Sequence, residues 1–291
     1  MRNLAWHLLA IATVAVWGTS FVSTKVLLGH GFTAVQVFAL RFAATWLLLL
    51  AMDRGRMRFL GIRDELRLAL CGLCGCTLYY WAENSALAIS PSGEVSLVVC
   101  GNPLLIMLFA GLLWREERLR PRQVLGCAVA FAGMAVVVLD GTFVLGLSPL
   151  GGLLAFAAAA SWAVYSLAAR PLNARLPALL VTRRMFFHGT LSSVPILFAE
   201  GGARIPWENF AEPVVALNFL ALTLLSSLFG YLVWNKVLRR LGTVLASNYI
   251  YAIPLVTVAT AAVALGERVT AGTVAGGIAL ALGMFLAETK R

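Results

Sequence analysis

The sequence predicts an all-α integral membrane protein, with ten transmembrane helices arranged as two inverted-topology five-helix repeats. Three observations predict this fold: long apolar blocks, a one-sided distribution of Lys and Arg, and an internal repeat. Of the 291 residues, 60% are hydrophobic and only 12% are charged, whereas about a quarter of a soluble domain is charged. The connectors between the blocks are short, so we expect no separate soluble domain.

The apolar blocks are long enough to be transmembrane helices, because roughly 20 apolar residues cross about 30 Å of hydrocarbon. Their continuous hydrophobicity excludes barrel strands, in which polar and apolar residues alternate. Ser90 and Ser148 each precede a proline, a pattern typical of a helix N-cap followed by a first-turn proline. The predicted helices lie near residues 4–24, 33–51, 67–88, 91–113, 123–139, 150–169, 179–199, 214–235, 243–264 and 270–287.

The basic residues give these helices a direction. With the N-terminus in the cytoplasm, 19 of the 23 Lys and Arg residues fall in cytoplasmic segments, and only Lys25, Arg204 and Arg268 fall in outer loops. This asymmetry is what the positive-inside rule expects. The formal net charge of +10 does not indicate nucleic-acid binding, because the arginines lie in short loops between apolar blocks and no nucleic-acid motif accompanies them.

The chain matches itself when it is shifted by about 150 residues. The matched pairs are Trp17 with Trp162, Tyr80 with Tyr231, Pro103 with Pro254, Glu117 with Glu267, Gly126 with Gly276, and Gly133 with Gly283. They recur in order across each half, so we expect repeats over residues 1–143 and 144–291. Because five is an odd number, the second repeat begins on the opposite side of the membrane, as in many transporters.

Several motifs carry a family resemblance. They are Trp17-Gly18-x-x-Phe21 in the first helix, Arg41-Phe42 in the second, and Glu117 and Glu267 at the start of the fifth and tenth. Together they resemble the drug/metabolite transporter (DMT) superfamily, in its EamA family, and the aromatic-rich interior is most similar to the YddG-like amino-acid exporters. The resemblance covers almost the whole chain. It implies a ten-helix bundle with a central cavity, used for export across a bacterial inner membrane, with both termini cytoplasmic.

Aromatic and polar side chains within the spans predict the substrate-binding site, because polarity inside a membrane costs free energy and is kept where it functions. Trp17 and Ser20 share one face of the first helix, and Trp162 and Tyr165 repeat this step in the sixth. We expect the two faces to line one cavity from both sides. The alternative is that these aromatic residues fill space between packed helices.

The third helix adds Tyr80, Glu83 and Asn84, and Glu83 places an acidic side chain within a span. A buried glutamate could bind a proton or a substrate ammonium. However, Glu83 is predicted close to the outer surface, where it would be a solvated residue at the cavity mouth. Further substrate-binding candidates on the fourth and ninth helices are Ser96, Asn102, Asn248 and Tyr251.

Two prolines, Pro103 and Pro254, fall near the middle of the fourth and ninth spans. Proline removes a backbone donor and kinks a helix, and paired interruptions in two halves point to a midplane site with hinges. A passive kink is the alternative. Tyr231 and Trp234 are weaker site candidates, since both approach the cytoplasmic interface, where aromatic belts lie.

Charged residues near or within the spans have two interpretations each. Arg41 lies mid-span and needs a partner, so it locks helices of the first half together or contacts substrate. Lys25 lies near the outer end of the first helix, where it attracts a carboxylate or extends to the interface. Glu117 and Glu267 are predicted to be structural, because a carboxylate complements the dipole at a helix start.

Enzymatic chemistry has no support in the sequence. No phosphate-binding loop, nucleophile elbow or paired metal motif is present, and the five cysteines lie within apolar blocks. We therefore predict neither a cofactor nor a metal. The leading hypothesis is a secondary transporter that exports small metabolites, most directly amino acids including aromatic ones, by alternating access. We expect a monomer whose partners are this small-molecule substrate and the lipid bilayer.

Two other functions stay open. A multidrug or quaternary-cation efflux transporter needs an anionic residue deep in the membrane, but the first helix has no acid and Glu83 is predicted near the surface. A membrane scaffold or receptor is not excluded, although an inverted repeat has no evident use there.

Overall fold

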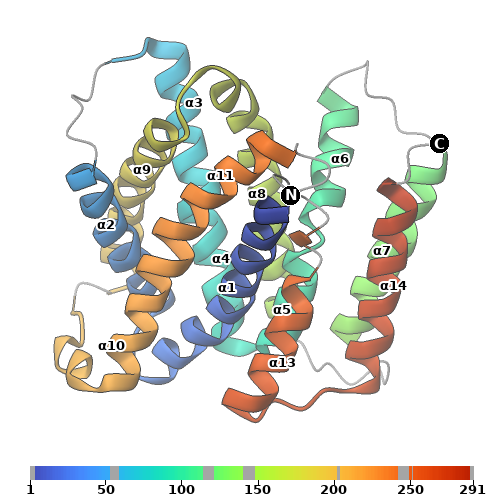
Figure 1. Cartoon of the computed structure of the whole chain (residues 1–291). Helices are drawn as coiled ribbons and strands as arrows, with labels where there is room; N and C mark the ends of the chain where they lie inside the picture. The colour runs from blue at the N-terminus through green and yellow to red at the C-terminus, as the bar shows by residue number, and fades with distance from the viewer. Residues whose placement is uncertain are drawn as a thin grey trace.

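The computed structural model describes residues 4–52, 59–113, 121–139, 148–201, 204–241, 249–250 and 252–288. All regular structure within these residues is helical, which confirms the all-α class (Figure 1). In the N-terminal half the helices are α1 (Leu4–Gly29), α2 (Ala34–Met52), α3 (Ile62–Gly72), the π-helix η1 (Leu73–Leu78), α4 (Tyr79–Ile89), α5 (Ser92–Val99), α6 (Asn102–Leu113) and α7 (Pro121–Leu139).

The C-terminal half begins with the long helix α8, and its helical segments follow a similar plan. They are α8 (Pro149–Arg175), α9 (Ala178–Ala199), the 3-10 helix η2 (Trp207–Ala211), α10 (Pro213–Leu220), the π-helix η3 (Ala221–Phe229), α11 (Gly230–Leu241), α13 (Ile253–Leu265) and α14 (Ala271–Glu288). Both π-helices are continuous with the α-helices on either side, so residues 62–89 and 213–241 each form one long helical rod.

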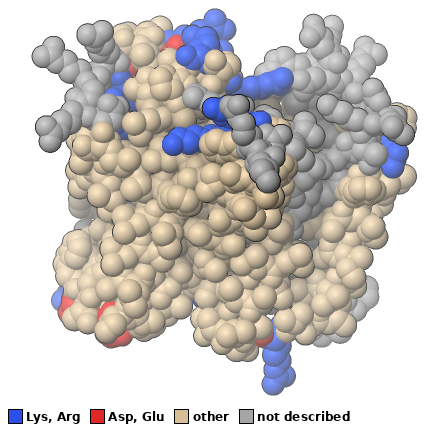
Figure 2. Space-filling model, in the orientation of Figure 1, with Lys and Arg blue, Asp and Glu red and all other residues tan. Residues whose placement is uncertain are grey.

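Four helical stretches are long and apolar enough to cross a membrane: Leu4–Gly29, Ala34–Met52, Pro149–Arg175 and Pro213–Val237. Large apolar side chains also cover the outside of the bundle, as at Leu255 and Val263 of α13, which are 74% and 90% exposed. Figure 2 shows a broad band without charged residues, with Lys and Arg gathered mainly toward the end that carries the N-terminus. Such a surface suits hydrocarbon rather than water.

Helix α8 begins as the sequence predicts. Ser148 is its N-cap and accepts a hydrogen bond from the Gly151 N–H at 2.9 Å, with a proline in the first turn. The same prediction is wrong for Ser90. Helix α5 begins two residues later, at Ser92, and the Ser90 hydroxyl has no hydrogen-bond partner, because a carboxylate from a distant loop caps α5 instead.

The two paired prolines do not kink continuous helices. The fourth predicted span is divided into α5 and α6 by a turn at Cys100-Gly101, and Pro103 lies in the first turn of α6. Pro254 likewise lies in the first turn of α13. Backbone N–H groups in the first turn of a helix form no hydrogen bond within the helix. Proline, which has no N–H, is therefore tolerated there.

Helices α7 and α14 pack closely along their length (Figure 1). A Cβ atom added to Gly133 of α7 would lie 2.8 Å from the Gly276 carbonyl oxygen, and one added to Gly283 of α14 would lie 2.6 Å from the Gly126 carbonyl oxygen. Small residues allow such backbone approach between membrane helices. The two contacts are repeat partners of each other, because the 150-residue shift matches Gly133 with Gly283 and Gly126 with Gly276.

Candidate substrate site

Each half contains a π-helix directly before a buried tyrosine. η1 ends two residues before Tyr80, and η3 ends two residues before Tyr231. The hydroxyl oxygens of these two tyrosines lie 3.3 Å apart, within hydrogen-bonding distance. A π-helix widens the turn and changes where the following side chains point, and it is frequent at functional sites. The matched positions of the two halves thus meet in the interior.

Trp17 of α1 lies against the residues that follow η3. Its Nε1 donates a hydrogen bond to the Ser226 carbonyl at 3.1 Å. Its ring centroid lies 6.0 Å from that of Tyr231 and 5.1 Å from that of Trp234. Tyr231 and Trp234 are only 3% and 7% exposed. Both side chains therefore lie inside the bundle, packed on Trp17, rather than on its outer surface. Their depth relative to the cytoplasmic interface stays a prediction.

Trp162 of α8 approaches the same tyrosine from another helix. Its ring centroid lies 6.3 Å from that of Tyr231 and 4.9 Å from those of Tyr79 and Tyr165. Tyr165 itself packs on Gly75 of η1, where a Cβ atom would come within 2.6 Å of the ring. Trp17 and Trp162, the first matched pair of the sequence, thus both contact Tyr231.

Arg41 of α2 is 1% exposed. Its Nε donates to the Ser227 hydroxyl, and its Nη2 donates at 3.2 Å to both the Tyr80 and the Ser226 hydroxyls. The guanidinium carbon also lies 4.6 Å from the centroid of the Tyr80 ring, a cation–π distance. Among the described residues Arg41 forms no ion pair. Because two of its partners belong to η3, it joins the two halves rather than only helices of the first.

Glu83 of α4 is 3% exposed, so its carboxylate is buried rather than solvated at an open mouth. It interacts with the Tyr79 hydroxyl and with the charge of Arg41. One of its two oxygens has no hydrogen-bond partner among the described residues. A buried carboxylate with spare acceptor capacity can receive a donor from a ligand.

We call the following residues the central layer: Trp17, Arg41, Tyr79, Tyr80, Glu83, Trp162, Tyr165, Ser226, Ser227, Tyr231 and Trp234. It combines a cation, a carboxylate, several hydroxyls and a set of aromatic faces, contributed by both halves. Its aromatic side chains fill the space between the helices in this conformation, as the rings contact one another.

Other predicted site residues make separate contacts. Ser20 and Ser96 donate hydrogen bonds to carbonyls of their own helices. Asn84 donates to the Ala34 carbonyl at 3.1 Å and so ties α4 to the start of α2. Asn102 is buried, and its side-chain oxygen has no partner. Asn248 and Tyr251 lie outside the described residues.

The two serines of η3 were not recognised from the sequence. Ser226 and Ser227 stand in an apolar block and form no motif. The only available signal is their place five and four residues before Tyr231, about one helical turn, which puts them on nearly the same face of the helix.

A second charged cluster lies where α1 ends (Figure 1). Lys25 pairs with Glu267 at 2.9 Å and donates to the Ser90 carbonyl at 2.7 Å. Glu267 accepts from the Ser92 N–H at 2.9 Å, from the Ser92 hydroxyl at 2.9 Å and from the Gly93 N–H at 3.4 Å. We call these residues the Lys25–Glu267 cluster. It connects α1, α5 and the α13–α14 loop.

Glu267 therefore does not stabilise the start of its own helix, as the sequence suggested, because α14 begins four residues later. It caps α5, whose first N–H groups have no helical acceptor. Burial by itself raises the pKa of Glu267. The hydrogen bonds from Lys25 and Ser92 together lower it by more than burial raises it, so the pKa lies below its usual value. Its sequence partner Glu117 lies outside the described residues.

The apolar helices and their surface define a multi-pass membrane protein with a polar and aromatic interior. The EamA-like transporter family matches the chain twice, over residues 4–139 and 149–289. The chain therefore belongs to the EamA-like transporter family.

Two relatives and one solved structure illustrate the similarity. A probable terminal-alkyne amino-acid exporter of Streptantibioticus cattleyicolor is 30% identical over 92% of this chain and 87% of its own. The aromatic amino acid exporter YddG of Ancylobacter novellus is 32% identical over 73% of this chain and 72% of its own. A crystal structure that is 24% identical superposes with a TM-score of 0.65, covering 98% of this chain and 97% of that one; it supports the fold alone.

Proposed function

We propose that this protein is a secondary transporter that exports amino acids, including aromatic ones, and related small metabolites. Membership of a transporter family supports the class of function. The relatives named as amino-acid exporters support the class of substrate. The central layer supplies chemistry that fits such a substrate.

We further propose ten transmembrane helices in two inverted halves, residues 1–143 and 144–291, with both termini in the cytoplasm of a bacterial cell. The double family match supports two related halves. So do the matched π-helices and the reciprocal glycine contacts of α7 and α14. The basic residues near the N-terminal end of the molecule support the orientation (Figure 2), because cytoplasmic segments carry the excess of Lys and Arg.

The buried pair of opposite charges is the observation that carries the substrate proposal. An amino acid presents a carboxylate, an ammonium and a side chain. Arg41 has no carboxylate partner among the described residues, and a guanidinium binds a carboxylate in a bidentate manner. Glu83 has a free oxygen that can accept from an ammonium. Trp17 and Trp162 offer flat apolar faces for the side chain of the substrate.

Alternating access requires the halves to move, because the aromatic rings fill the central layer in this conformation. The Lys25–Glu267 cluster joins α1, α5 and the α13–α14 loop at one end of the bundle, and with the proposed orientation this is the outer end. Export therefore requires that Glu267 release Lys25 or the N-terminus of α5. The turn between α5 and α6 is a place where such a motion can be absorbed.

The proposal is tested by reconstituting the purified protein into liposomes loaded with labelled phenylalanine, with and without a pH gradient. We expect efflux well above that of protein-free liposomes. Phenylalaninamide lacks the carboxylate and N-acetylphenylalanine lacks the ammonium, so we expect both to compete poorly. Absence of flux for every amino acid tested would contradict the function.

Variants test the roles of the two charges. Glu83→Gln keeps the shape but removes the negative charge, and hydrogen bonds to charged groups are worth about 1.5–3 kcal/mol, so we expect the apparent affinity for phenylalanine to fall about tenfold or more. Arg41→Lys keeps the charge but loses the bidentate geometry and should weaken binding similarly. Thr19→Ala, at an exposed position of α1, is the control and should transport normally.

Efflux of organic cations is the second candidate, and the burial of Glu83 favours it. Glu83 is 3% exposed, so its carboxylate is enclosed by the protein as a cation site requires. The same liposomes distinguish the two functions. Each rate is compared with that of protein-free liposomes, because tetraphenylphosphonium and neutral phenylalaninamide also cross a bare bilayer. Cation efflux predicts that the protein accelerates the loss of these two compounds more than that of phenylalanine, whereas amino-acid export predicts the reverse.

A further inference from the structure

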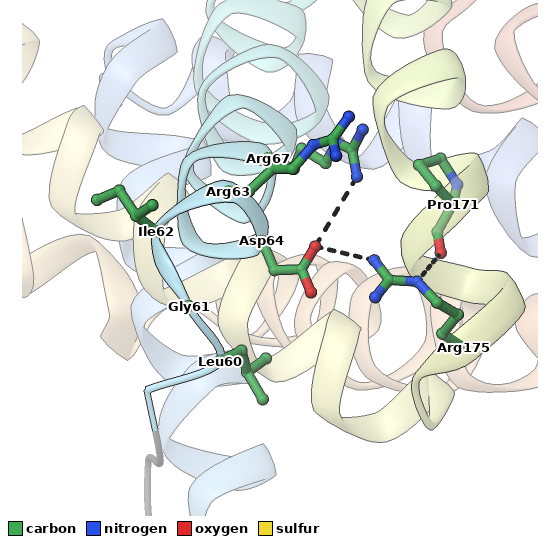
Figure 3. Close-up of a pocket in the computed structure, with 8 residues that line it drawn as sticks. All are labelled: Leu60, Gly61, Ile62, Arg63, Asp64, Arg67, Pro171 and Arg175. Carbon is green, nitrogen blue, oxygen red and sulfur yellow. Dashed lines mark hydrogen bonds and ion pairs between the residues drawn. The ribbon is translucent and has the colours of Figure 1, made fainter.

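A basic pocket lies far from the central layer, between the first turn of α3 and the last turn of α8 (Figure 3). Its volume is about 430 Å³, within the range of small-molecule sites. Arg63, Arg67 and Arg175 line it together with Asp64 and Pro171. It lies at the end of the bundle where α3 begins and α8 ends, on the same side as the N-terminus (Figure 1).

The charges of the pocket are held in place and are unbalanced. Asp64 pairs with Arg175 at 2.9 Å and with Arg67 at 3.8 Å, and the Arg175 Nε donates to the Pro171 carbonyl at 3.3 Å. Arg63 forms no ion pair among the described residues. Three guanidinium groups thus face one carboxylate. This excess of positive charge favours an anion, and guanidinium groups suit phosphate oxygens.

The start of α3 adds to the positive electrostatic potential of the pocket. Gly61 is the N-cap, with φ of 101° in the left-handed region, and no side chain caps the helix. Gly61 lines the pocket, so the positive end of the α3 dipole opens into it, partly offset by Asp64 and Glu65 in the first turn. The geometry therefore combines a helix N-terminus with a cluster of arginines, both of which favour a phosphate group.

The surroundings of the pocket distinguish a lipid from a free anion. Ile62, Leu66 and Leu70 follow one another at steps of four residues and are 69%, 63% and 40% exposed, forming an apolar stripe on α3. Arg63 and Arg67 each follow one residue after a member of this stripe, so they lie on the adjacent face. In a bilayer the stripe faces acyl chains while the arginines reach the headgroup level.

We propose that this pocket binds the phosphate headgroup of an anionic phospholipid whose acyl chains lie along the apolar stripe of α3. Basic pockets between transmembrane helices are known to hold such headgroups. The site is separate from the proposed transport site, and it contains residues of α3 in one half and α8 in the other. A bound lipid thus bridges the two halves at this end.

Binding is measured by native mass spectrometry of the full chain in detergent, titrated with phosphatidylglycerol or with phosphatidylcholine as the neutral lipid. We expect one retained phosphatidylglycerol and no comparable phosphatidylcholine adduct. Each arginine near a headgroup contributes about fivefold to affinity, so Arg63→Gln should weaken phosphatidylglycerol binding about fivefold, and Arg63→Gln with Arg67→Gln about 30-fold. Arg122→Gln, an exposed arginine of α7 outside this pocket, is the matched control and should bind as the unmodified protein does.

Free inorganic phosphate and glycerol 3-phosphate form the third arm of the experiment. We expect neither to displace phosphatidylglycerol at millimolar concentration, because they have no acyl chains. Equal affinity for the free anions would overturn the lipid assignment. Unchanged phosphatidylglycerol binding in the double variant would overturn the site itself. Thermal unfolding of the double variant, expected to match that of the unmodified protein, shows that the change is not a loss of fold.

Discussion

The two ends of the bundle use the same charge chemistry in different ways. At one end Glu267 meets Lys25 and caps α5, and the side chains are only 16% and 28% exposed. At the other end Asp64 meets Arg175 beside an open pocket, and their side chains are 15% and 55% exposed. The first carboxylate bonds backbone N–H groups as well as a cation, whereas the second bonds only guanidinium groups. The comparison teaches that the Lys25–Glu267 cluster fastens the helices at its end, whereas the Asp64–Arg175 pair leaves a pocket accessible.

The largest effect is expected from Glu267→Ala. It leaves Lys25 without its carboxylate and the first N–H groups of α5 without a cap, and each unsatisfied buried group costs about 1–3 kcal/mol. We expect the free energy of unfolding, or the apparent Tm in one detergent, to fall accordingly. Glu212→Ala is the control, because Glu212 forms an exposed pair with His30 and is 55% exposed. Equal losses in both variants would contradict the comparison.

Exchanging the two charges separates the ion pair from the cap. The double variant Lys25→Glu with Glu267→Lys restores an ion pair, but an ammonium cannot accept from the N–H groups of α5. We therefore expect recovery relative to Lys25→Glu alone, with a remaining deficit of about 1 kcal/mol, the usual value of an N-cap. Full recovery, measured by the same thermal unfolding, would mean that the cap is unimportant.

Acidification should reduce the contribution of Glu267 to stability by less than these substitutions do. Because the pKa of Glu267 in the folded protein lies below its usual value, its contribution to stability is complete above the usual carboxyl pKa and is lost as the pH falls through the lowered one. The stability difference between the unmodified protein and Glu267→Ala should be constant near neutral pH and shrink in acid. A difference that grows in acid would reverse the sign of this argument.

The smallest effect is expected at the accessible end. A double-mutant cycle of Asp64→Asn and Arg175→Gln should give a coupling energy of only about 0.2–1 kcal/mol, because the Arg175 side chain is 55% exposed and water and salt screen its charge. The cycle is measured by thermal unfolding without added lipid. A coupling as large as the loss in Glu267→Ala would remove the distinction between the two ends.

The positions of the helices could be predicted because hydrophobicity is a local property. Each described α-helix overlaps an apolar block, and Ser148 begins α8 as expected. The helices α1, α3, α8 and α11 extend beyond their blocks, and the 3-10 helix η2 lies outside them. Lys25 was predicted with two alternatives, and the carboxylate partner is the one found. Trp17 and Trp162 were expected to line one cavity from both sides. Both contact Tyr231 in the structure, and their role in a cavity stays a prediction.

The partners of buried polar groups could not be predicted, because they come from residues far apart in the chain. Arg41 bonds Ser226 and Ser227, about 185 residues away, and Glu267 caps a helix 175 residues earlier. The π-helices were also missed, since a π-helix has no clear sequence pattern. Only the three-dimensional packing shows that Tyr231 turns inward.

The glycine contacts between α7 and α14 have a mechanical consequence. Where two backbones touch at both Gly133 and Gly283, neither helix can slide or rotate without steric collision. We therefore expect this helix pair to act as a rigid pivot during the transport cycle. The displacement of each turnover then falls on the helices around the central layer, and the pair sets the axis about which they turn.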